Sequence, residues 1–223
     1  MKKAVIFDMY ETLITHYKSP LYFSTEMSED AGLTYDQFYP LWKQSEPDRW
    51  VGKMTFEQCI EHIMKTYNCY SEEKLATIVE KRMATKVEVF TQLHEHIIPM
   101  LEKLKEEGIR IGLISNCFSE EVIAIRNSVL APYFDFLCLS YEQGLQKPDP
   151  EIFHCCMNHL HVQPEECLYV GDGGSQELET AKALNMLPLQ ATWYFQEGLQ
   201  FQSKRNPEFL QLNDPMDLFE YLK

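Results

Sequence analysis

Four short runs of apolar residues, separated by segments with helical periodicity, constrain the fold of this chain more than any other feature. The first run ends on a carboxylate, Asp8. The runs span residues 5–7, 109–114, 134–139 and 167–170, and a weaker run spans residues 187–193. Mainly apolar runs of this length are typical of parallel strands that are buried on both faces. The alternation therefore predicts an α/β fold, in which helices cover both faces of a Rossmann-like parallel sheet.

Residues 16–85 interrupt this alternation, because they carry almost no strand signal. Apolar residues recur there at spacings of three and four, as they do on one face of a helix. Breaks between helices are expected at Gly32 and at Pro40. We therefore expect a helical cap, residues 16–85, inserted into a catalytic core that is formed by residues 1–15 and 86–223.

Charge and cysteine content limit the classes of partner. The chain has 34 Asp and Glu against 20 Lys and Arg, which gives a formal net charge of −14. This charge argues against a nucleic-acid partner or an anionic membrane surface, but it allows a local basic pocket for a small anionic substrate. We find no signal-peptide pattern and no run of about 18 apolar residues, so we expect no membrane span. The seven cysteines show no zinc-like spacing, and we expect a cytoplasmic protein with reduced thiols.

The polar residues that follow the apolar runs are expected to meet in space. Parallel strands have their carboxyl ends at one edge of the sheet, and in open α/β folds ligands bind at that edge. The residues that reach it are Asp8, Ser115 with Asn116, Lys147 in a loop, and Asp172. Their shared edge predicts a functional site.

Carboxylates dominate this predicted site. Asp8 and Asp172 are joined by Glu177, which follows Asp172 closely enough to point at the same place. Carboxylates held close together repel one another unless a cation lies between them. Hard oxygen ligands that leave positions for water and phosphate suit Mg²⁺. Asp8 could then attack an electrophile, while the metal and Lys147 neutralise the developing charge.

Four ordered motifs resemble those of the haloacid dehalogenase-like (HAD) hydrolase superfamily. They are Asp8-Met9-Tyr10-Glu11-Thr12, Ser115-Asn116, Lys147-Pro148-Asp149-Pro150, and Gly171-Asp172 followed by Glu177. The helical insertion also lies where this superfamily places its C1-type cap. The resemblance implies that Asp8 is the nucleophile of a covalent aspartyl intermediate. It further implies that Asp8, Asp172 and the backbone carbonyl of Tyr10 ligate Mg²⁺, with Glu177 supporting the ion through water.

The resemblance assigns phosphoryl binding to a second group of residues. Ser115 and Thr12 would bind the transferred phosphoryl group, helped by Asn116. Lys147 would hold the charge on Asp8 and on the phosphoryl oxygens.

Tyr10 departs from the pattern of most phosphatases in this superfamily, which have a second aspartate there as general acid and base. A phenol is a poor proton donor at neutral pH, and the loss of a positioned acid–base group typically costs about 10²- to 10⁴-fold in rate. A tyrosine at this position is similar to the motif of the 2-haloacid dehalogenases, which release halide without a proton and without Mg²⁺. Those enzymes lack an acid at the position of Asp172, so the acids of this chain favour Mg²⁺-dependent phosphoryl hydrolysis.

Three functions stay open at this point. The favoured one is hydrolysis of a small phosphate ester or anhydride with a good leaving group. Alkyl phosphates are expected to be slow, unless Glu11 or a cap residue supplies the proton. The alternative is a metal-independent 2-haloacid dehalogenase. The third is a non-catalytic binding module that keeps the fold, for which Tyr10 is the supporting feature.

The inserted helices are expected to carry substrate specificity, because the four motifs handle only the reacting group. Arg49, Trp50 and Lys53 form a cationic and aromatic cluster in a loop flanked by Pro and Gly. Arg49 is a candidate for binding a carboxylate or phosphate of the substrate. The alternative is an exposed loop whose Trp50 packs on the cap.

Overall fold

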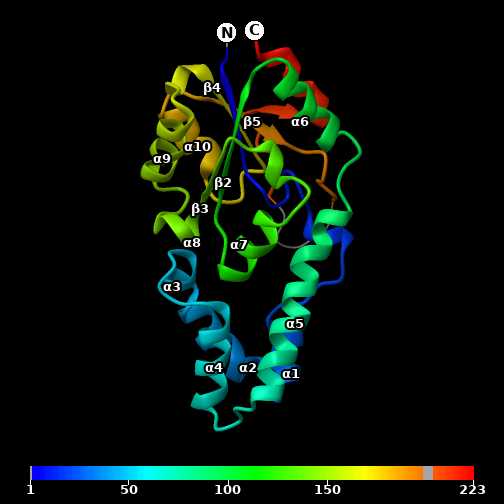
Figure 1. The fold of residues 1–223 in the computed structure, drawn as a ribbon, viewed down its shortest axis with the longest axis vertical. Coiled ribbons are helices and arrows are strands. Elements are labelled where there is room, and N and C mark those ends of the chain that lie inside the picture. Colours follow the sequence, from blue (N-terminus) through cyan, green and yellow to red (C-terminus); the bar gives the residue numbers. More distant parts are fainter. Residues whose placement is uncertain (1, 198–202) are drawn as a thin grey trace.

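One parallel sheet forms the centre of the wider of two lobes in the computed structural model, which describes residues 2–197 and 203–223 (Figure 1). The sheet has the strand order β3-β2-β1-β4-β5-β6, and every neighbouring pair is parallel. The strands are β1 (Ala4–Phe7), β2 (Arg110–Ser115), β3 (Phe136–Leu139), β4 (Cys167–Gly171), β5 (Leu187–Ala191) and β6 (Leu210–Leu212). Strand β1 lies between β2 and β4, where Phe7 pairs with Leu113 and with Val170. The parallel α/β sheet predicted from the apolar runs is confirmed.

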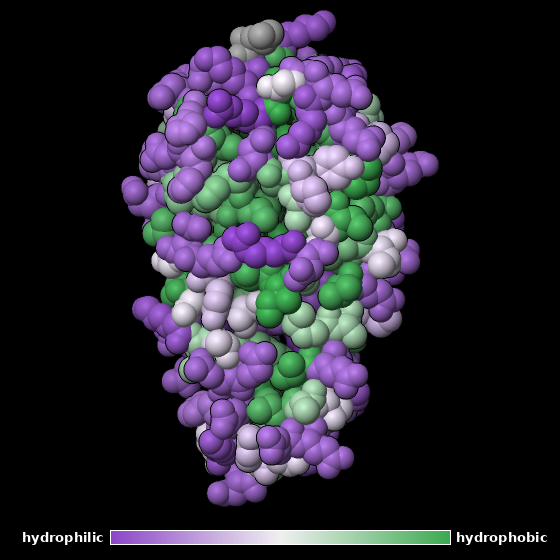
Figure 2. Space-filling view, in the orientation of Figure 1, coloured by the Kyte–Doolittle hydropathy of each residue, from purple (hydrophilic) through white to green (hydrophobic). Residues whose placement is uncertain are grey.

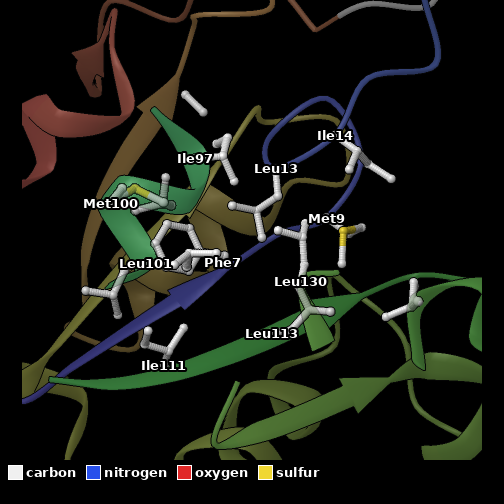
Figure 3. Close-up of a cluster of buried hydrophobic side chains, with 14 of the residues drawn as sticks. Phe7, Met9, Leu13, Ile14, Ile97, Met100, Leu101, Ile111, Leu113 and Leu130 are labelled. Carbon is white, nitrogen blue, oxygen red and sulfur yellow. The ribbon is translucent and has the colours of Figure 1, made fainter. Parts of the chain in front are cut away.

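Alternate residues of β1 pack into separate cores on the two faces of the sheet. Val5 and Phe7 belong to the core covered by α6 (Ile97–Glu106) and α7 (Ser119–Arg126), and Figure 3 shows Phe7 beside Met100 and Leu101 of α6. Ala4 and Ile6 belong to the opposite core. That core is covered by α9 (Pro150–Leu160) and α10 (Glu177–Ala183). Because both faces of β1 are covered, its four residues are fully buried.

The narrower lobe consists of helices (Figure 1). They are α1 (Ser24–Ala31), α2 (Tyr35–Gln44), α3 (Glu46–Trp50), α4 (Phe56–Thr66) and α5 (Glu72–Glu88). A third core lies inside this lobe and includes Phe38, Phe56 and Ile60. Thr55 accepts a hydrogen bond from a backbone N–H of the first turn of α4, as its position before the helix predicts.

The break expected at Gly32 is present, and the break expected at Pro40 is wrong. Gly32 ends α1 with a φ of 77°, a left-handed conformation that favours glycine. Helix α2 continues through Pro40. Proline removes the hydrogen bond to the carbonyl of Asp36, but both residues lie on the exposed side of the helix, where water can hydrate that carbonyl.

Other boundaries also differ from the sequence pattern. Strand β3 starts at Phe136 rather than at residue 134, β5 ends at Ala191, and β6 is an additional strand of three residues. Helix α5 runs to Glu88, so a division of the chain at residue 85 falls inside that helix. The short helices are 3₁₀ segments at His16–Lys18, Val89–Thr91, Ala131–Tyr133, Pro164–Glu166 and Pro215–Tyr221, and an α-helical turn, α8 (Ser140–Gln143).

Two buried ion pairs connect the lobes through α5 and α7. Arg82 Nε lies 3.1 Å from Oε1 of Glu120, and Lys86 Nζ lies 2.5 Å from Oε1 of Glu121. All four side chains are buried. Although burial alone would raise the pKa of Glu121, Lys86 and Arg82 lower it to about 2. The charged pairs therefore fix α5 against the start of α7.

The surface is mixed, and Figure 2 shows hydrophilic residues over both ends of this face with hydrophobic residues toward its middle. All seven cysteines are free thiols, and five of them are buried. Within the described residues, we find no helix with the length and apolar character that a membrane crossing requires.

Candidate active site

Asp8 lies directly after the central strand, and only 7% of it is exposed. Its backbone N–H donates to the carbonyl of Val170 at 2.8 Å, which ties it to β4. Its Oδ1 accepts the N–H of Met9 at 2.7 Å. The side chain is therefore held at the carboxyl edge of the sheet, as predicted from the abrupt end of the first apolar run.

Lys147 forms an ion pair with Asp8. Its Nζ lies 2.6 Å from Asp8 Oδ1, and the lysine is 3% exposed. Burial alone would lower the pKa of Lys147, but the carboxylates of Asp8 and Glu177 raise it above the usual value. Lys147 therefore stays charged beside Asp8.

The side chain of Asn116 holds the backbone of Lys147. Its Nδ2 donates to the Lys147 carbonyl at 3.0 Å, and its Oδ1 accepts the Lys147 N–H at 2.8 Å. Asn116 was expected to help bind the phosphoryl group through its backbone or its side chain. In the structure its amide is engaged with the loop that carries the lysine.

Asp8, Asp172 and Glu177 meet as predicted, with one carboxylate oxygen from each within 4.8 Å of the others. Burial raises the pKa of Asp8 to about 6, although Lys147 opposes the shift. Burial, then Glu177 and Asp8, raise the pKa of Asp172 to about 7. One ammonium group does not neutralise three carboxylates, two of which are buried, so the donor set fits a divalent cation with oxygen ligands, such as Mg²⁺.

Glu177 shapes the loop that carries Asp172. Its two carboxylate oxygens accept the N–H groups of Gly173 and Ser175, each at 2.7 Å. Gly173 has a φ of 98°, which a residue with a side chain rarely adopts. A Cβ at Gly171 would lie 2.8 Å from Glu177 Oε1, so glycine there allows the carboxylate to approach. Glu177 thus orders the backbone around the acids.

Thr12 and Ser115 each carry a buried hydroxyl without a hydrogen-bond partner among the described residues. Thr12, in the first motif, lies in the loop after β1, and Ser115, in the second motif, is the last residue of β2. An unpaired buried hydroxyl is costly. The two hydroxyls are therefore candidates to donate to an oxygen of a bound substrate.

Tyr10 packs its ring on the imidazole of His16, with the ring centroids 4.7 Å apart and the planes 14° from parallel. Burial, and then Glu121 and Cys117, raise the pKa of Tyr10 well above that of a free phenol. Tyr10 is therefore an even weaker acid than its residue type indicates.

Glu11 is engaged beside the site. Its carboxylate accepts the Thr15 hydroxyl at 2.7 Å and the His16 N–H at 2.9 Å. These bonds fix it at the edge of a cavity of about 150 Å³. The cavity is lined by Asp8, Tyr10, Glu11, Asn116, Lys147, Asp172, Gly174 and Ser175.

Arg49 does not lie in an exposed loop, and this expectation is wrong. It is part of α3 and is 1% exposed, because its guanidinium stacks between Trp42, at 3.5 Å, and Phe118, at 4.2 Å. It does not line the cavity that contains Asp8. Trp50 stacks on Phe118 of the sheet lobe rather than within the helical lobe. The cluster therefore belongs to the contact between the lobes.

Ser203 is a site residue that sequence reasoning missed. Its hydroxyl donates to Asp172 Oδ2 at 2.6 Å. It lies 31 residues after Asp172 and belongs to none of the four motifs. No local pattern indicates this contact, which depends on how the chain returns after β5.

A model of the haloacid dehalogenase-like hydrolase family matches residues 2–185. The rhythmically expressed gene 2 protein of Drosophila melanogaster is 37% identical over 86 residues, which are 37% of this chain and 33% of that protein. The phosphoglycolate phosphatase of Aquifex aeolicus is 24% identical over 223 residues, which cover 99% of this chain and 96% of that enzyme. Three relatives match over shorter segments, and the aligned part covers only 33% to 55% of the length of each relative.

Solved structures share the fold. A HAD family enzyme from Bacteroides thetaiotaomicron, in complex with magnesium and inorganic phosphate, aligns with a TM-score of 0.67 at 18% identity, over 89% of this chain and 98% of that one. The L-2-haloacid dehalogenase of Xanthobacter autotrophicus aligns with a TM-score of 0.63 at 19% identity, over 100% and 98% of the two chains. These likenesses show the fold alone. Because the family match extends over residues 2–185 and takes in all four motifs, this protein belongs to the haloacid dehalogenase-like hydrolase family.

Proposed function

We propose that this hydrolase is a Mg²⁺-dependent phosphatase, in which Asp8 receives the phosphoryl group of a small anionic substrate. The cluster of Asp8, Asp172 and Glu177 carries the proposal, because one carboxylate oxygen from each lies within 4.8 Å of the others and both Asp8 and Glu177 are buried. Two further acids beside a nucleophilic carboxylate are unfavourable without a divalent cation. The phosphatase name of the Aquifex aeolicus relative, similar over 99% of this chain, supports the same choice.

Asp8, Asp172 and the backbone carbonyl of Tyr10 would hold Mg²⁺, while Glu177 keeps the Asp172 loop in place. When bound, the ion would neutralise the acids and the charge on the transferred group. Thr12 and Ser115 would donate their unpaired hydroxyls to the phosphoryl oxygens.

Asp8 acts as the nucleophile in two steps. A carboxylate oxygen forms a bond to phosphorus while the bond from phosphorus to the leaving-group oxygen breaks. Water then attacks phosphorus, releases phosphate and returns the carboxylate. Lys147, 2.6 Å from Asp8, stabilises the ionised nucleophile throughout.

The leaving group must depart largely as an anion. The pKa of Tyr10 is raised by burial, and the carboxylate of Glu11 accepts two hydrogen bonds. Neither residue is placed as an acid, so we expect substrates with good leaving groups, such as acyl or aryl phosphates. A series of phosphate esters with added Mg²⁺ tests this. The rate should fall steeply as the pKa of the leaving group rises, and a flat dependence would contradict the proposal.

Dehalogenation is the second candidate, and Tyr10 is the observation that favours it. The two chemistries place solvent oxygen differently. In the phosphatase, water attacks phosphorus, and its oxygen ends in phosphate. In the dehalogenase, Asp8 forms an alkyl ester with the substrate, and water that attacks the carbonyl carbon of this ester leaves its oxygen in Asp8. Single turnover in H₂¹⁸O should therefore leave Asp8 unlabelled. Halide release from 2-chloropropionate in the presence of a chelator, with label in Asp8, would establish the dehalogenase.

The helices α1 to α5 are proposed to act as a cap over this site.

The free thiols fit a cytoplasmic protein. The proposed partner is a small molecule, since the net charge of −14 disfavours nucleic acid and anionic membranes.

A further inference from the structure

A larger cavity, of about 490 Å³, opens beside the candidate active site. It lies among the segment that follows the first motif and helices α1 and α2. Six of its lining residues carry aromatic rings: His16, Tyr17, Phe23, Tyr35, Tyr39 and Trp42. A volume of this size is typical of a pocket for a small molecule, about 300–1,000 Å³.

The cavity is continuous with the catalytic loops. Glu11 lines both this cavity and the one that contains Asp8. The ring of Tyr10 stacks on His16, and His16 meets Phe23 edge-on at 5.7 Å. On the other side, Trp42 contacts the ring of Phe118, which follows the second motif. A molecule that places its phosphoryl group at Asp8 would therefore extend into an aromatic enclosure.

The charged side chains that line the cavity disfavour a leaving group with an anionic substituent. No Lys or Arg side chain lines the cavity in the part of the chain that the structure describes, whereas Glu11 and Glu26 do. The Glu26 carboxylate accepts the N–H of Phe23 at 2.8 Å and so stays at the lining. A leaving group with a carboxylate substituent would face Glu11 and Glu26, and no Lys or Arg among the described residues lines the cavity to pair with it.

We propose that this cavity binds the leaving group of the substrate, and that this group is an aromatic ring without a charged substituent, so that the substrate is an aryl phosphate. The negative charge that develops on departure lies on the ester oxygen, at the phosphoryl site beside Asp8. The inference rests on the proposed phosphatase function. Aromatic side chains bind flat rings by offset stacking and edge-to-face contacts. A phenol also satisfies the requirement for departure without an acid, because its pKa, like that of tyrosine, is about 10. Substrates whose leaving group carries a carboxylate, such as phosphoglycolate, should be poor.

Tyr39 offers a test, because it lines the cavity, is 37% exposed and belongs to none of the four motifs. We would measure kcat/KM for 2-naphthyl phosphate, acetyl phosphate and phosphoglycolate with saturating Mg²⁺. Tyr39→Ala should lower kcat/KM for 2-naphthyl phosphate about tenfold through KM, and leave acetyl phosphate unchanged. Tyr67→Ala is the matched control, since Tyr67 is also 37% exposed but does not line the cavity.

Binding without turnover gives an independent readout. In Asp8→Asn with Mg²⁺, naphthalene-2-phosphonate should bind more tightly than methylphosphonate, and Tyr39→Ala should remove the difference. If acetyl phosphate is hydrolysed but the aryl ester and its phosphonate have no advantage, the cavity proposal is overturned and the phosphatase stands. If acetyl phosphate is not hydrolysed either, the phosphatase function itself fails, because that substrate makes no demand on the cavity.

Discussion

The side chain of Asn116 holds the backbone of Lys147. Its Nδ2 donates to the Lys147 carbonyl at 3.0 Å, and its Oδ1 accepts the Lys147 N–H at 2.8 Å. Lys147 in turn places its Nζ 2.6 Å from Asp8. The second motif therefore fixes the third, and the third supports the nucleophile of the first. Asn116 is in this sense a positioning residue, because it acts on Asp8 through Lys147.

Replacing Asn116 tests this relationship. Asn116→Ala should lower kcat by up to about 10²-fold with little change in KM, because a small displacement of a catalytic group is costly. Asn116→Asp keeps an acceptor for the Lys147 N–H but loses the donor, so its kcat should be intermediate. Steady-state kinetics with an aryl phosphate and Mg²⁺ would measure both. The exposed Asn127→Ala is the control, and an unchanged kcat in Asn116→Ala would refute the positioning role.

Lys147→Met should make Asp8 a poorer nucleophile, because it should lower the ionised fraction of the Asp8 carboxyl group. Lys147 opposes the effect of burial on the pKa of Asp8, so its removal raises that pKa above about 6. The acid limb of the profile of kcat/KM against pH should move to higher pH, and kcat should fall. Lys182→Met, on the exposed side of α10, should change neither. A fall in kcat without movement of the acid limb would point to a role for Lys147 other than charge.

Metal-free protein should lose stability as the pH rises. The folded-state pKa values of Asp8 and Asp172, about 6 and about 7, exceed the unfolded value of about 3.9. The folded state thus binds more protons, and ionisation of these groups is an increasing penalty between pH 4 and pH 7. Their contribution should lower the Tm in chelator at pH 8 relative to pH 5.

Mg²⁺ should remove that penalty, so the Tm increase with Mg²⁺ should be larger at pH 8 than at pH 5. At a hundredfold excess over Kd, binding stabilises a protein by about 2.7 kcal/mol. Asp172→Asn should abolish the increase, and the exposed Glu179→Gln should retain it. If Mg²⁺ raises the Tm of Asp172→Asn as much as that of the parent protein, the ion binds elsewhere.

The buried pair of Lys86 and Glu121 should matter far more to stability than a surface pair. Glu121→Gln leaves the buried ammonium unpaired and should cost about 3–5 kcal/mol. Glu142→Gln breaks the more exposed pair with Arg126 and should cost about 0–1 kcal/mol. Urea unfolding measures both, and equal losses would contradict the assignment. Lys86→Met combined with Glu121→Gln should be less destabilised than the sum of the single variants.

The features that follow from local patterns could be predicted. Asp8 ends an apolar run, and a carboxylate is too costly to leave inside a buried strand, so its place at the sheet edge was determined locally. The meeting of Asp8 with Asp172 followed from the common direction of parallel strands. The roles of these residues in catalysis stay predictions until they are tested.

Features that depend on tertiary packing could not be predicted. Arg49 has the composition of a surface clamp, but Trp42 and Phe118, distant in sequence, enclose it. Strand β6 is three residues long and exists because it pairs with β5, so no run of apolar residues marks it. Ser203 reaches Asp172 only through the path of the chain after β5.

The central place of β1 has a consequence for synthesis on the ribosome. Ala4 pairs with Arg110 and with Cys167, so β1 has neighbours made 106 and 163 residues later. At about 5–20 residues per second, β1 waits several seconds for its first partner and longer for its second. Such distant pairing makes folding slow and leaves an apolar segment available to chaperones meanwhile. Since Asp172 follows β4, the nucleophile gains its acidic partner only after a further 164 residues are made, and hydrolysis by a nascent chain would report that this point has passed.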